Sequence, residues 1–184
     1  ATSGARLRGN GAIKAMEELK QIEVYRQNAS YARQHGEMAV YQRSNVANVA
    51  CRNAIEEAIR QHFDGMHLDV RGAKKVLETF GAPRVLLVLA NTVQQKAWDG
   101  RFSMENRKWA QTYELPVDEE LAGDRRSAYV VQSHPAVLDG FIQQTRRLVQ
   151  ERTLQQKKER LQDQLHPAKL PAQPKKSRAA AQER

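Results

Sequence analysis

Cysteine is almost absent from this 184-residue sequence, and so is any long apolar run. The single Cys51 excludes an internal disulfide, and there is no second thiolate with which to build a cysteine-based zinc site. The longest purely apolar run, residues 85–90, is far shorter than the roughly 20 residues that span a bilayer, and no signal segment opens the chain. We therefore expect a cytoplasmic protein with no membrane partner.

Motifs of metal and phosphate chemistry are also missing. There is no glycine-rich phosphate loop with its lysine, and the nearest approach to a metal cluster is His62, Asp64 and His67 in HFDGMH. Two imidazoles share a helix face at four-residue spacing, whereas five residues and a glycine turn separate these two. We expect a helix end instead, with His62 at the negative end of the helix dipole and Asp64 accepting from turn amides. No metal site is predicted.

The candidate nucleophiles and acids stand apart from one another. Cys51 lies on the apolar side of a predicted helix, where buried thiols are usually inert. Ser103 and Ser133 occupy positions typical of helix caps, and a capping or packing role is expected for His134. The neighbouring Glu56–Glu57 pair diverges by about 100° on a helix and cannot converge on a substrate. We predict no catalytic residue, no cofactor and a non-enzymatic function.

What the chain does have is positive charge, placed unevenly within a formal net charge of +9. Residues 12–145 carry 17 Lys and Arg against 17 Asp and Glu, so this part is neutral. Residues 146–184 carry 11 against 4, and residues 1–11 add Arg6 and Arg8. Basic ends on a neutral body typically bind a polyanion, most often DNA or RNA phosphate backbone, or remain solvated tails. Both interpretations stay open at this point.

Helical periodicity dominates the rest of the sequence and predicts a mainly α fold, with at most one minor short strand. We expect a flexible leader over residues 1–11, a single compact helical domain over 12–150, and a basic helical extension with a disordered tail over 151–184. Helices are predicted over residues 12–20, 29–35, 37–63, 70–80, 82–98, 104–113 and 135–165, with Asn28 or Ser30 and then Asp69 as expected caps and Gly81 as an expected C-terminal stop. The last of these carries the apolar stripe Val137, Leu138, Phe141, Ile142, Thr145, Leu148 and Val149, which is expected to face the core.

Two segments allow more than one secondary structure. VLLVL, residues 85–89, reads alone as a buried strand, but Pro83 in a first-turn position and apolar residues at four-residue intervals favour a buried helix. SAYVV, residues 127–131, is typical of either one short strand or an extended linker.

The stretch AWDGRFSMENRKWA, residues 97–110, concentrates aromatic and charged residues. We interpret it as a helix–turn–helix corner in which three aromatic side chains clamp an Asp99-Gly100 turn. The predicted clamp consists of Trp98, Phe102 and Trp109. The basic residues outside this corner, Arg101, Arg107 and Lys108, are candidates for contact with a partner.

Three blocks carry a resemblance to a known family. They are VYRQNASYARQHGEMAVYQRSNVANVACRNAIEEAIRQHFDGMHLD, RVLLVLANTVQQKAWDGRFSMENRKWA and SHPAVLDGFIQQTRRLV. In order and spacing they resemble a bacterial domain-of-unknown-function family carried on conjugative elements and phages of Gram-positive gut bacteria. The family implies no catalytic residues. In size, basicity and helical pattern the chain is also similar to anti-CRISPR proteins that inhibit the RNA-guided nuclease of type II systems.

The resemblance implies two functions. The first is an anti-CRISPR protein of a phage or other mobile genetic element that binds the guide-loaded type II CRISPR effector nuclease and blocks target DNA engagement or cleavage. The second is a general DNA- or RNA-binding accessory of a mobile element. In either case the expected nucleic-acid or partner contacts are Arg146, Arg147, Arg152, Lys157, Lys158, Arg160, Lys175, Lys176, Arg178, Arg101, Arg107 and Lys108.

Overall fold

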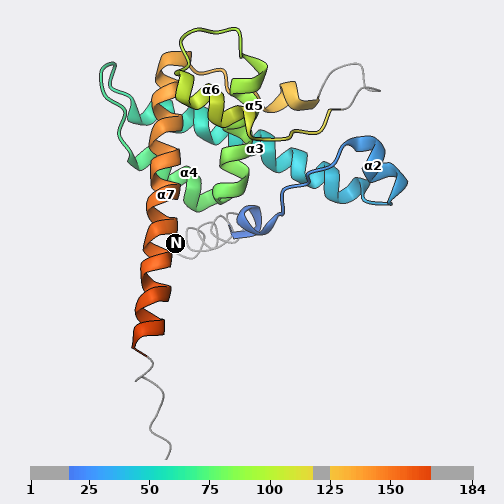
Figure 1. The fold of residues 1–184 in the computed structure, drawn as a ribbon. Coiled ribbons are helices and arrows are strands. Elements are labelled where there is room, and N and C mark those ends of the chain that lie inside the picture. Colours follow the sequence, from blue (N-terminus) through green and yellow to red (C-terminus); the bar gives the residue numbers. More distant parts are fainter. Residues whose placement is uncertain (1–16, 118–124, 167–184) are drawn as a thin grey trace, which may run out of the picture. The chain divides into compact units, whose positions relative to one another are not determined.

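Helices make up all the regular structure that the computed structural model describes, which covers residues 17–117 and 125–166 (Figure 1). Within those two ranges the one strand-like pairing is an isolated antiparallel bridge between Phe63 and Leu68. The prediction of a mainly α fold is therefore confirmed. The predicted leader, residues 1–11, and the part of the predicted tail beyond residue 166 lie outside the described residues.

The helices begin and end close to their predicted positions. Their bounds are α2 Ala29–Gln34, α3 Met38–His62, α4 Arg71–Phe80, α5 Ala82–Gln95, α6 Met104–Gln111, the 3-10 helix η1 Arg125–Tyr129 and α7 Pro135–Leu165. Residues 17–21 are helical as well. The long C-terminal helix is thus present as α7, which is continuous to Leu165.

Side-chain caps and glycines explain most of these boundaries. Asn28 accepts a hydrogen bond from the Tyr31 backbone N–H at 2.8 Å and starts α2, and Ser103 accepts from the Asn106 N–H at 3.2 Å and starts α6. Gly81, at φ +81°, separates α4 from α5, a conformation that residues with a Cβ rarely adopt. These three signals are readable in the sequence and are confirmed.

Two predicted caps are displaced by one residue. Helix α4 has Val70 at its N-cap, although the Asp69 carboxylate still accepts from the Arg71 N–H at 2.9 Å. Before α7 the capping residue is His134 in place of Ser133, because the His134 carbonyl accepts from the Leu138 N–H and its Nδ1 accepts from the Ala136 N–H at 3.2 Å. Pro135 therefore takes the first helical position, where its missing N–H costs nothing.

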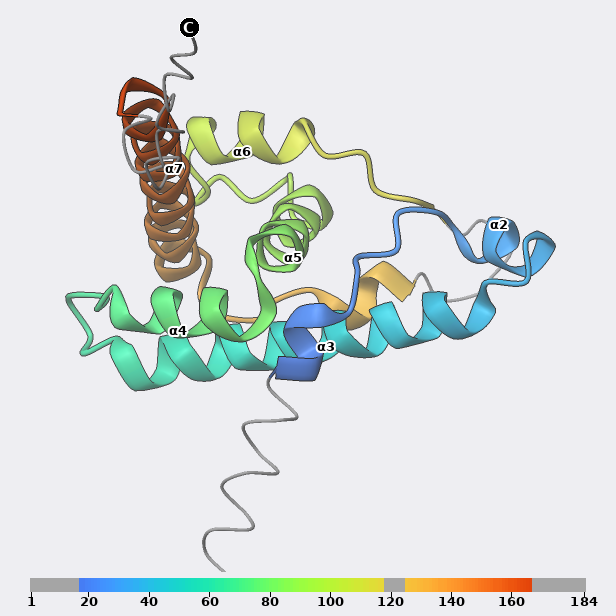
Figure 2. The ribbon, with the colours of Figure 1, turned by 90° about the horizontal axis from the view of Figure 1, so that it is seen from below.

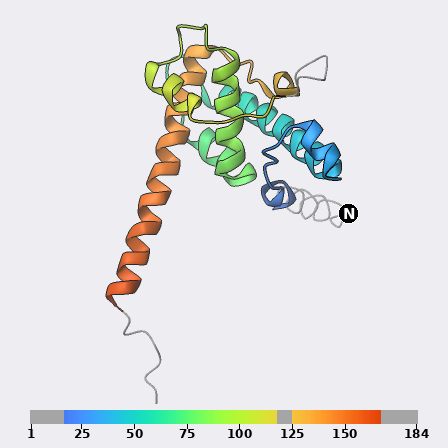
Figure 3. The same ribbon diagram turned by 45° about the vertical axis from the view of Figure 1, so that its right-hand side comes forward.

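Two compact units divide the chain, residues 1–149 and residues 150–184. In the first unit α3 runs beside α4, and α5 packs against both (Figure 2). Helix α6 lies next to α5 (Figure 3). In the second unit the described residues, 150–166, are the C-terminal part of α7 and His166, and all of them are exposed.

The core of the first unit combines apolar side chains of α3, α4, α5 and the start of α7. The predicted stripe of α7 contributes four buried side chains, Leu138, Phe141, Ile142 and Thr145. Its other members, Val137, Leu148 and Val149, are partly buried against the same cluster. The stripe therefore faces the core as predicted.

The segment VLLVL is helical, as its four-residue periodicity predicts. It lies in α5, with Pro83 in the first turn, and Val85, Val88 and Leu89 are fully buried. A helix that packs on α3, α4 and α6 is apolar on most of its surface, which is why the run resembled a buried strand.

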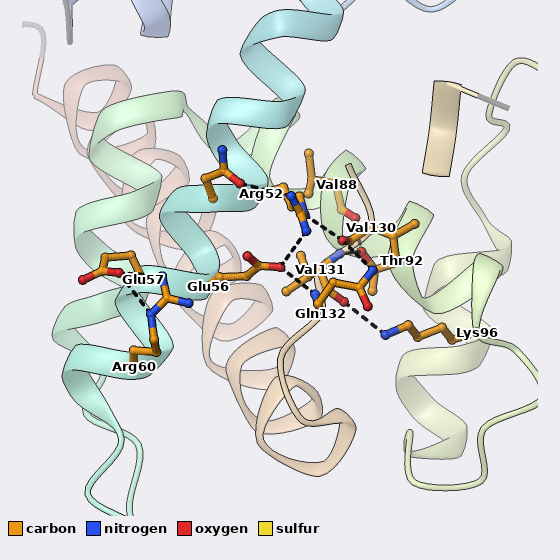
Figure 4. A network of polar contacts seen from close by, with 11 residues as sticks. Arg52, Glu56, Glu57, Arg60, Val88, Thr92, Lys96, Val130, Val131 and Gln132 are labelled. Carbon is orange, nitrogen blue, oxygen red and sulfur yellow. Dashed lines mark hydrogen bonds and ion pairs between the residues drawn. The ribbon is translucent and has the colours of Figure 1, made fainter. Parts of the chain in front are cut away.

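The strand or extended linker considered for SAYVV is wrong for most of the segment, since residues 125–129 form η1. The two valines that follow find side-chain partners in place of a neighbouring strand (Figure 4). Arg52 Nε donates to the Val130 carbonyl at 2.9 Å, and Lys96 Nζ donates to the Val131 carbonyl at 3.2 Å. The Val131 N–H donates to Thr92 Oγ1 at 3.0 Å. Because α3 and α5 satisfy this backbone, no second strand is needed.

Among the described residues no single helix has both the length and the apolar character to cross a membrane. The α4–α5 pair meets those criteria only when taken together, and it is bent by 114°.

Candidate nucleic-acid interface

The exposed cations of α7 form the candidate interface. They are Arg147, Arg152, Lys157, Lys158 and Arg160. None of the five makes an ion pair or a side-chain hydrogen bond with another residue of the described ranges. Four other arginines of the first unit are instead held by carboxylates, in the pairs Arg52–Glu56, Arg60–Glu57, Arg71–Asp69 and Arg101–Asp99. The α7 cations are therefore available to an external anion.

Acidic residues interrupt this basic helix. Between residues 150 and 166 four Lys and Arg accompany Glu151, Glu159 and Asp163, so the described part of the second unit has a net charge of only +1. Three predicted contacts that would add to it, Lys175, Lys176 and Arg178, lie outside the described residues. The interface thus consists of separate cationic side chains on one helix.

Arg146 behaves differently from its neighbour Arg147. Its side chain is only 17% exposed, and Nη1 donates to Asn106 Oδ1 at 2.8 Å and lies 3.8 Å from Glu105. The guanidinium also lies over the Trp109 ring, 5.2 Å from the centroid. Arg146 therefore joins α7 to α6 inside the first unit.

The predicted corner cations are likewise engaged in the fold, with one exception. Arg101 pairs with Asp99 at 2.8 Å, and Arg107 Nη2 donates to the Asp99 carbonyl at 2.7 Å. Lys108 is exposed, and none of the described residues pairs with it. The corner contributes at most Lys108 to a cationic surface.

The aromatic clamp predicted at this corner is wrong in part. Trp98 is 80% exposed, whereas Phe102 is buried and Trp109 packs partly against the core. Polar contacts hold the corner instead, because the Asp139 carboxylate accepts from the Ser103 N–H at 2.9 Å and from Asn106 Nδ2 at 2.8 Å. Sequence proximity alone did not show that Trp98 turns away from the core.

Asp99 gives the corner a pH dependence. The Arg101 guanidinium and then the Arg101 backbone N–H donate to its carboxylate, and they lower the pKa of Asp99 from 3.8 to about 2. A lowered pKa stabilises the folded state above pH 3.8, and this contribution disappears as the pH falls towards about 2. The unfolding free energy should therefore decrease less between pH 3.8 and about 2 in Asp99→Asn than in the unchanged chain. Urea titrations at a series of pH values measure this difference.

The matched control for this measurement is Asp163→Asn, because Asp163 is an exposed carboxylate with no partner among the described residues. Its pH profile should superimpose on that of the unchanged chain. An Asp99→Asn profile that also superimposes would contradict the assignment.

The residues weighed in the sequence as possible metal ligands, nucleophiles or acids make contacts within the fold. Asp64 accepts from the Met66 and His67 backbone N–H groups at 2.8 and 2.7 Å, and the described residues contain no group of three or more His, Cys, Asp or Glu that could hold a metal ion. Cys51 is fully buried, and burial raises the pKa of its thiol to about 12. Glu56 accepts from the Gln132 N–H at 2.7 Å, while Glu57 pairs with Arg60.

Sequence reasoning missed one feature, a pocket of about 870 Å³ between the segment before α2 and the end of α6. Its lining includes Arg26, Trp109 and Tyr113. The two aromatics stand four residues apart at the end of a predicted helix, which is a readable signal that they share a face. Their proximity to Arg26 depends on tertiary structure.

The comparisons with known proteins give a family and no function. No curated protein and no solved structure matches the chain. A family model described as "Protein of unknown function (DUF3849)" matches residues 24–150, which is more than two thirds of the sequence and includes α2 to α6 and the start of α7. The chain belongs to this DUF3849 family of proteins of unknown function.

Proposed function

We propose that the protein is a non-enzymatic binder of nucleic-acid phosphate backbone and serves as an accessory of a mobile genetic element. The observation that carries the proposal is the set of exposed α7 cations, Arg147, Arg152, Lys157, Lys158 and Arg160, which have no anionic partner within the described ranges. The family resemblance supports the mobile-element setting.

Cations spread along one helix suit a phosphate backbone better than a compact anion. A helix advances 1.5 Å per residue, so the eight residue steps from Arg152 to Arg160, all in the second unit, extend over about 12 Å. A nucleic-acid strand presents several phosphates over such a length. Each cation that contacts a phosphate and displaces a counterion contributes to affinity without reading the base sequence. Because Glu151, Glu159 and Asp163 interrupt the helix, we expect moderate, sequence-independent binding.

A fourfold charge-neutralised variant tests the proposal. We expect Arg152→Gln, Lys157→Gln, Lys158→Gln and Arg160→Gln together to weaken binding to a fluorescent single-stranded RNA by at least about tenfold, measured by anisotropy at about 0.1 M salt. All four residues are exposed and glutamine keeps a good helix former, so the fold should be unaffected.

The matched control removes four exposed cations from the first unit. It combines Lys20→Gln, Arg43→Gln, Lys74→Gln and Lys75→Gln, with the same loss of net charge. It should retain RNA affinity within about threefold, since long-range charge alone contributes modestly once salt screens it. Equal losses in the two variants would show that net charge and not the α7 surface determines binding, and the proposal would then be wrong.

The narrower hypothesis, inhibition of the guide-loaded type II CRISPR nuclease, is tested with the same proteins. It predicts that the unchanged chain in molar excess stops target DNA cleavage, and that a chain lacking residues 151–184 keeps part of this activity. A general accessory protein would bind plain RNA or DNA, leave cleavage unchanged, and lose nearly all binding on that deletion.

A further inference from the structure

The pocket near Trp109 is bounded by two parts of the first unit that lie far apart in the sequence. On one side are Arg26, Gln27 and Asn28, which precede α2, and on the other are Trp109 and residues 112–116 at the end of α6. Its volume of about 870 Å³ is within the range that small-molecule sites occupy. The structural contacts described above give no reason for the presence of this pocket.

One wall of the pocket is aromatic and rigidly built. The Trp109 and Tyr113 rings meet edge to face, with centroids 5.3 Å apart. Gln94 Nε2, from α5, donates to the carbonyls of Ala110 and Tyr113, both at 2.8 Å, and so fixes the backbone of this wall. Arg146 covers one face of the indole. Such support keeps the rings in place before a ligand arrives.

The opposite wall supplies positive charge and an amide. Arg26 is exposed, lines the pocket and makes no ion pair with a described residue. Burial raises the pKa of the Tyr113 phenol, and the charges of Arg26 and Arg146 oppose that shift, so both guanidinium groups lie near the ring. Gln27 adds a side chain that can donate and accept hydrogen bonds. Among the described residues that line the opening, Glu114 is the one acidic side chain.

Aromatic rings next to a cation and an amide fit a ligand with a planar ring and an anionic group. A nucleobase stacks on aromatic side chains with little dependence on its identity, and a guanidinium binds the attached phosphate. We propose that this pocket binds one nucleotide unit, with its base against Trp109 and Tyr113 and its phosphate on Arg26. The inference does not rest on phosphate binding by α7.

Tryptophan fluorescence tests the proposal directly, because one of the two tryptophans of the chain, Trp109, lines the pocket. In a Trp98→Phe background Trp109 is the only reporter, and the loss of an 80% exposed side chain should leave the fold intact. We expect adenosine monophosphate to quench the fluorescence of Trp109 at a concentration about tenfold lower than adenosine alone or ribose 5-phosphate alone requires. Far-UV circular dichroism checks that each variant is folded.

Three variants separate the expected contacts. Arg26→Gln should weaken adenosine monophosphate binding by at least about fivefold and leave adenosine unaffected. Tyr113→Leu, which keeps an apolar side chain, should weaken both ligands. Arg43→Gln, an exposed arginine outside the pocket, is the matched control and should change neither.

A short oligoadenylate distinguishes a nucleotide within a single strand from a free nucleotide as the natural ligand. Its binding is measured in a chain that also carries the four α7 substitutions. Tighter binding than the mononucleotide indicates a single strand as the natural ligand, and equal binding indicates a free nucleotide. Absence of quenching by both at millimolar concentration overturns the proposal, as does quenching that Arg26→Gln and Tyr113→Leu leave unchanged. Because four of the five exposed α7 cations are already neutral in this chain, the result does not depend on the outcome of the phosphate-binding test.

Discussion

Replacing Arg84 by methionine is expected to lower the free energy of unfolding by about 3–5 kcal/mol. Arg84 is 1% exposed although it is charged, and no carboxylate pairs with it among the described residues. Its guanidinium donates instead to backbone carbonyls and two polar side chains: Ser44 O at 2.9 Å, Ile22 O at 2.9 Å, Glu23 O at 3.1 Å, Ser44 Oγ at 3.3 Å and Asn48 Oδ1.

The size of this effect comes from the acceptors that would be left behind. Methionine fills a similar volume but donates nothing, so the buried Ser44 carbonyl of α3 would lose its partner at a cost of about 1–3 kcal/mol before relaxation. The partly buried carbonyls of residues 22–23 would lose theirs as well, at a smaller cost each. Lysine keeps the charge but lacks the planar fork that reaches α3 and residues 22–23 together, so Arg84→Lys should also destabilise.

The measurement is chemical denaturation followed by circular dichroism. Arg43→Met is the matched control, because Arg43 lies on α3 and is exposed, and it should change the unfolding free energy by less than about 0.5 kcal/mol. A stability of Arg84→Met equal to that of Arg43→Met would mean that the Arg84 network does not hold residues 22–23 against α3 and α5.

The second large effect is expected at Asn106, which is fully buried. Its Nδ2 donates to the Asp139 carboxylate at 2.8 Å and to the Asp139 carbonyl at 3.1 Å, while its Oδ1 accepts from Arg146. Asn106→Asp is nearly isosteric but places a second carboxylate oxygen against that of Asp139. We expect a loss of at least about 3 kcal/mol in unfolding free energy, because a buried carboxylate at position 106 would then contact the partly buried carboxylate of Asp139.

A second substitution shows whether this repulsion is the cause. Asn106→Asp combined with Asp139→Asn removes the like-charge contact and should be more stable than Asn106→Asp alone. Asn53→Asp, on the exposed face of α3, is the control for an asparagine-to-aspartate change and should be nearly neutral. If the double variant is no more stable than Asn106→Asp, the contact between α6 and α7 has been assigned incorrectly.

Local signals predicted the helices well because each depends on a few neighbouring residues. Asn28, Gly81 and Ser103 mark helix ends through a side-chain oxygen or a backbone conformation that the residue type itself provides. The four-residue periodicity around VLLVL correctly predicts a helix, because an α5 segment buried on most sides keeps that spacing.

The candidate site was less predictable because its contacts are tertiary. Arg146 and Arg147 are adjacent and chemically identical, yet only Arg146 is held by Asn106 and stacked on Trp109. The pocket beside Arg26 joins segments more than 80 positions apart, and no local pattern brings them together. Charge placement in the sequence indicated the basic end, but which cations remain unpaired depends on the fold.

The most direct test of nucleic-acid binding through α7 is the salt dependence of affinity for single-stranded RNA. Binding through the α7 cations predicts that the logarithm of the association constant falls linearly with the logarithm of salt concentration between ~50 and ~200 mM. In the variant with Arg152, Lys157, Lys158 and Arg160 neutralised the slope should be shallower by about 0.7 for each phosphate contact removed. An affinity that does not change with salt, or identical slopes for the two proteins, would contradict it.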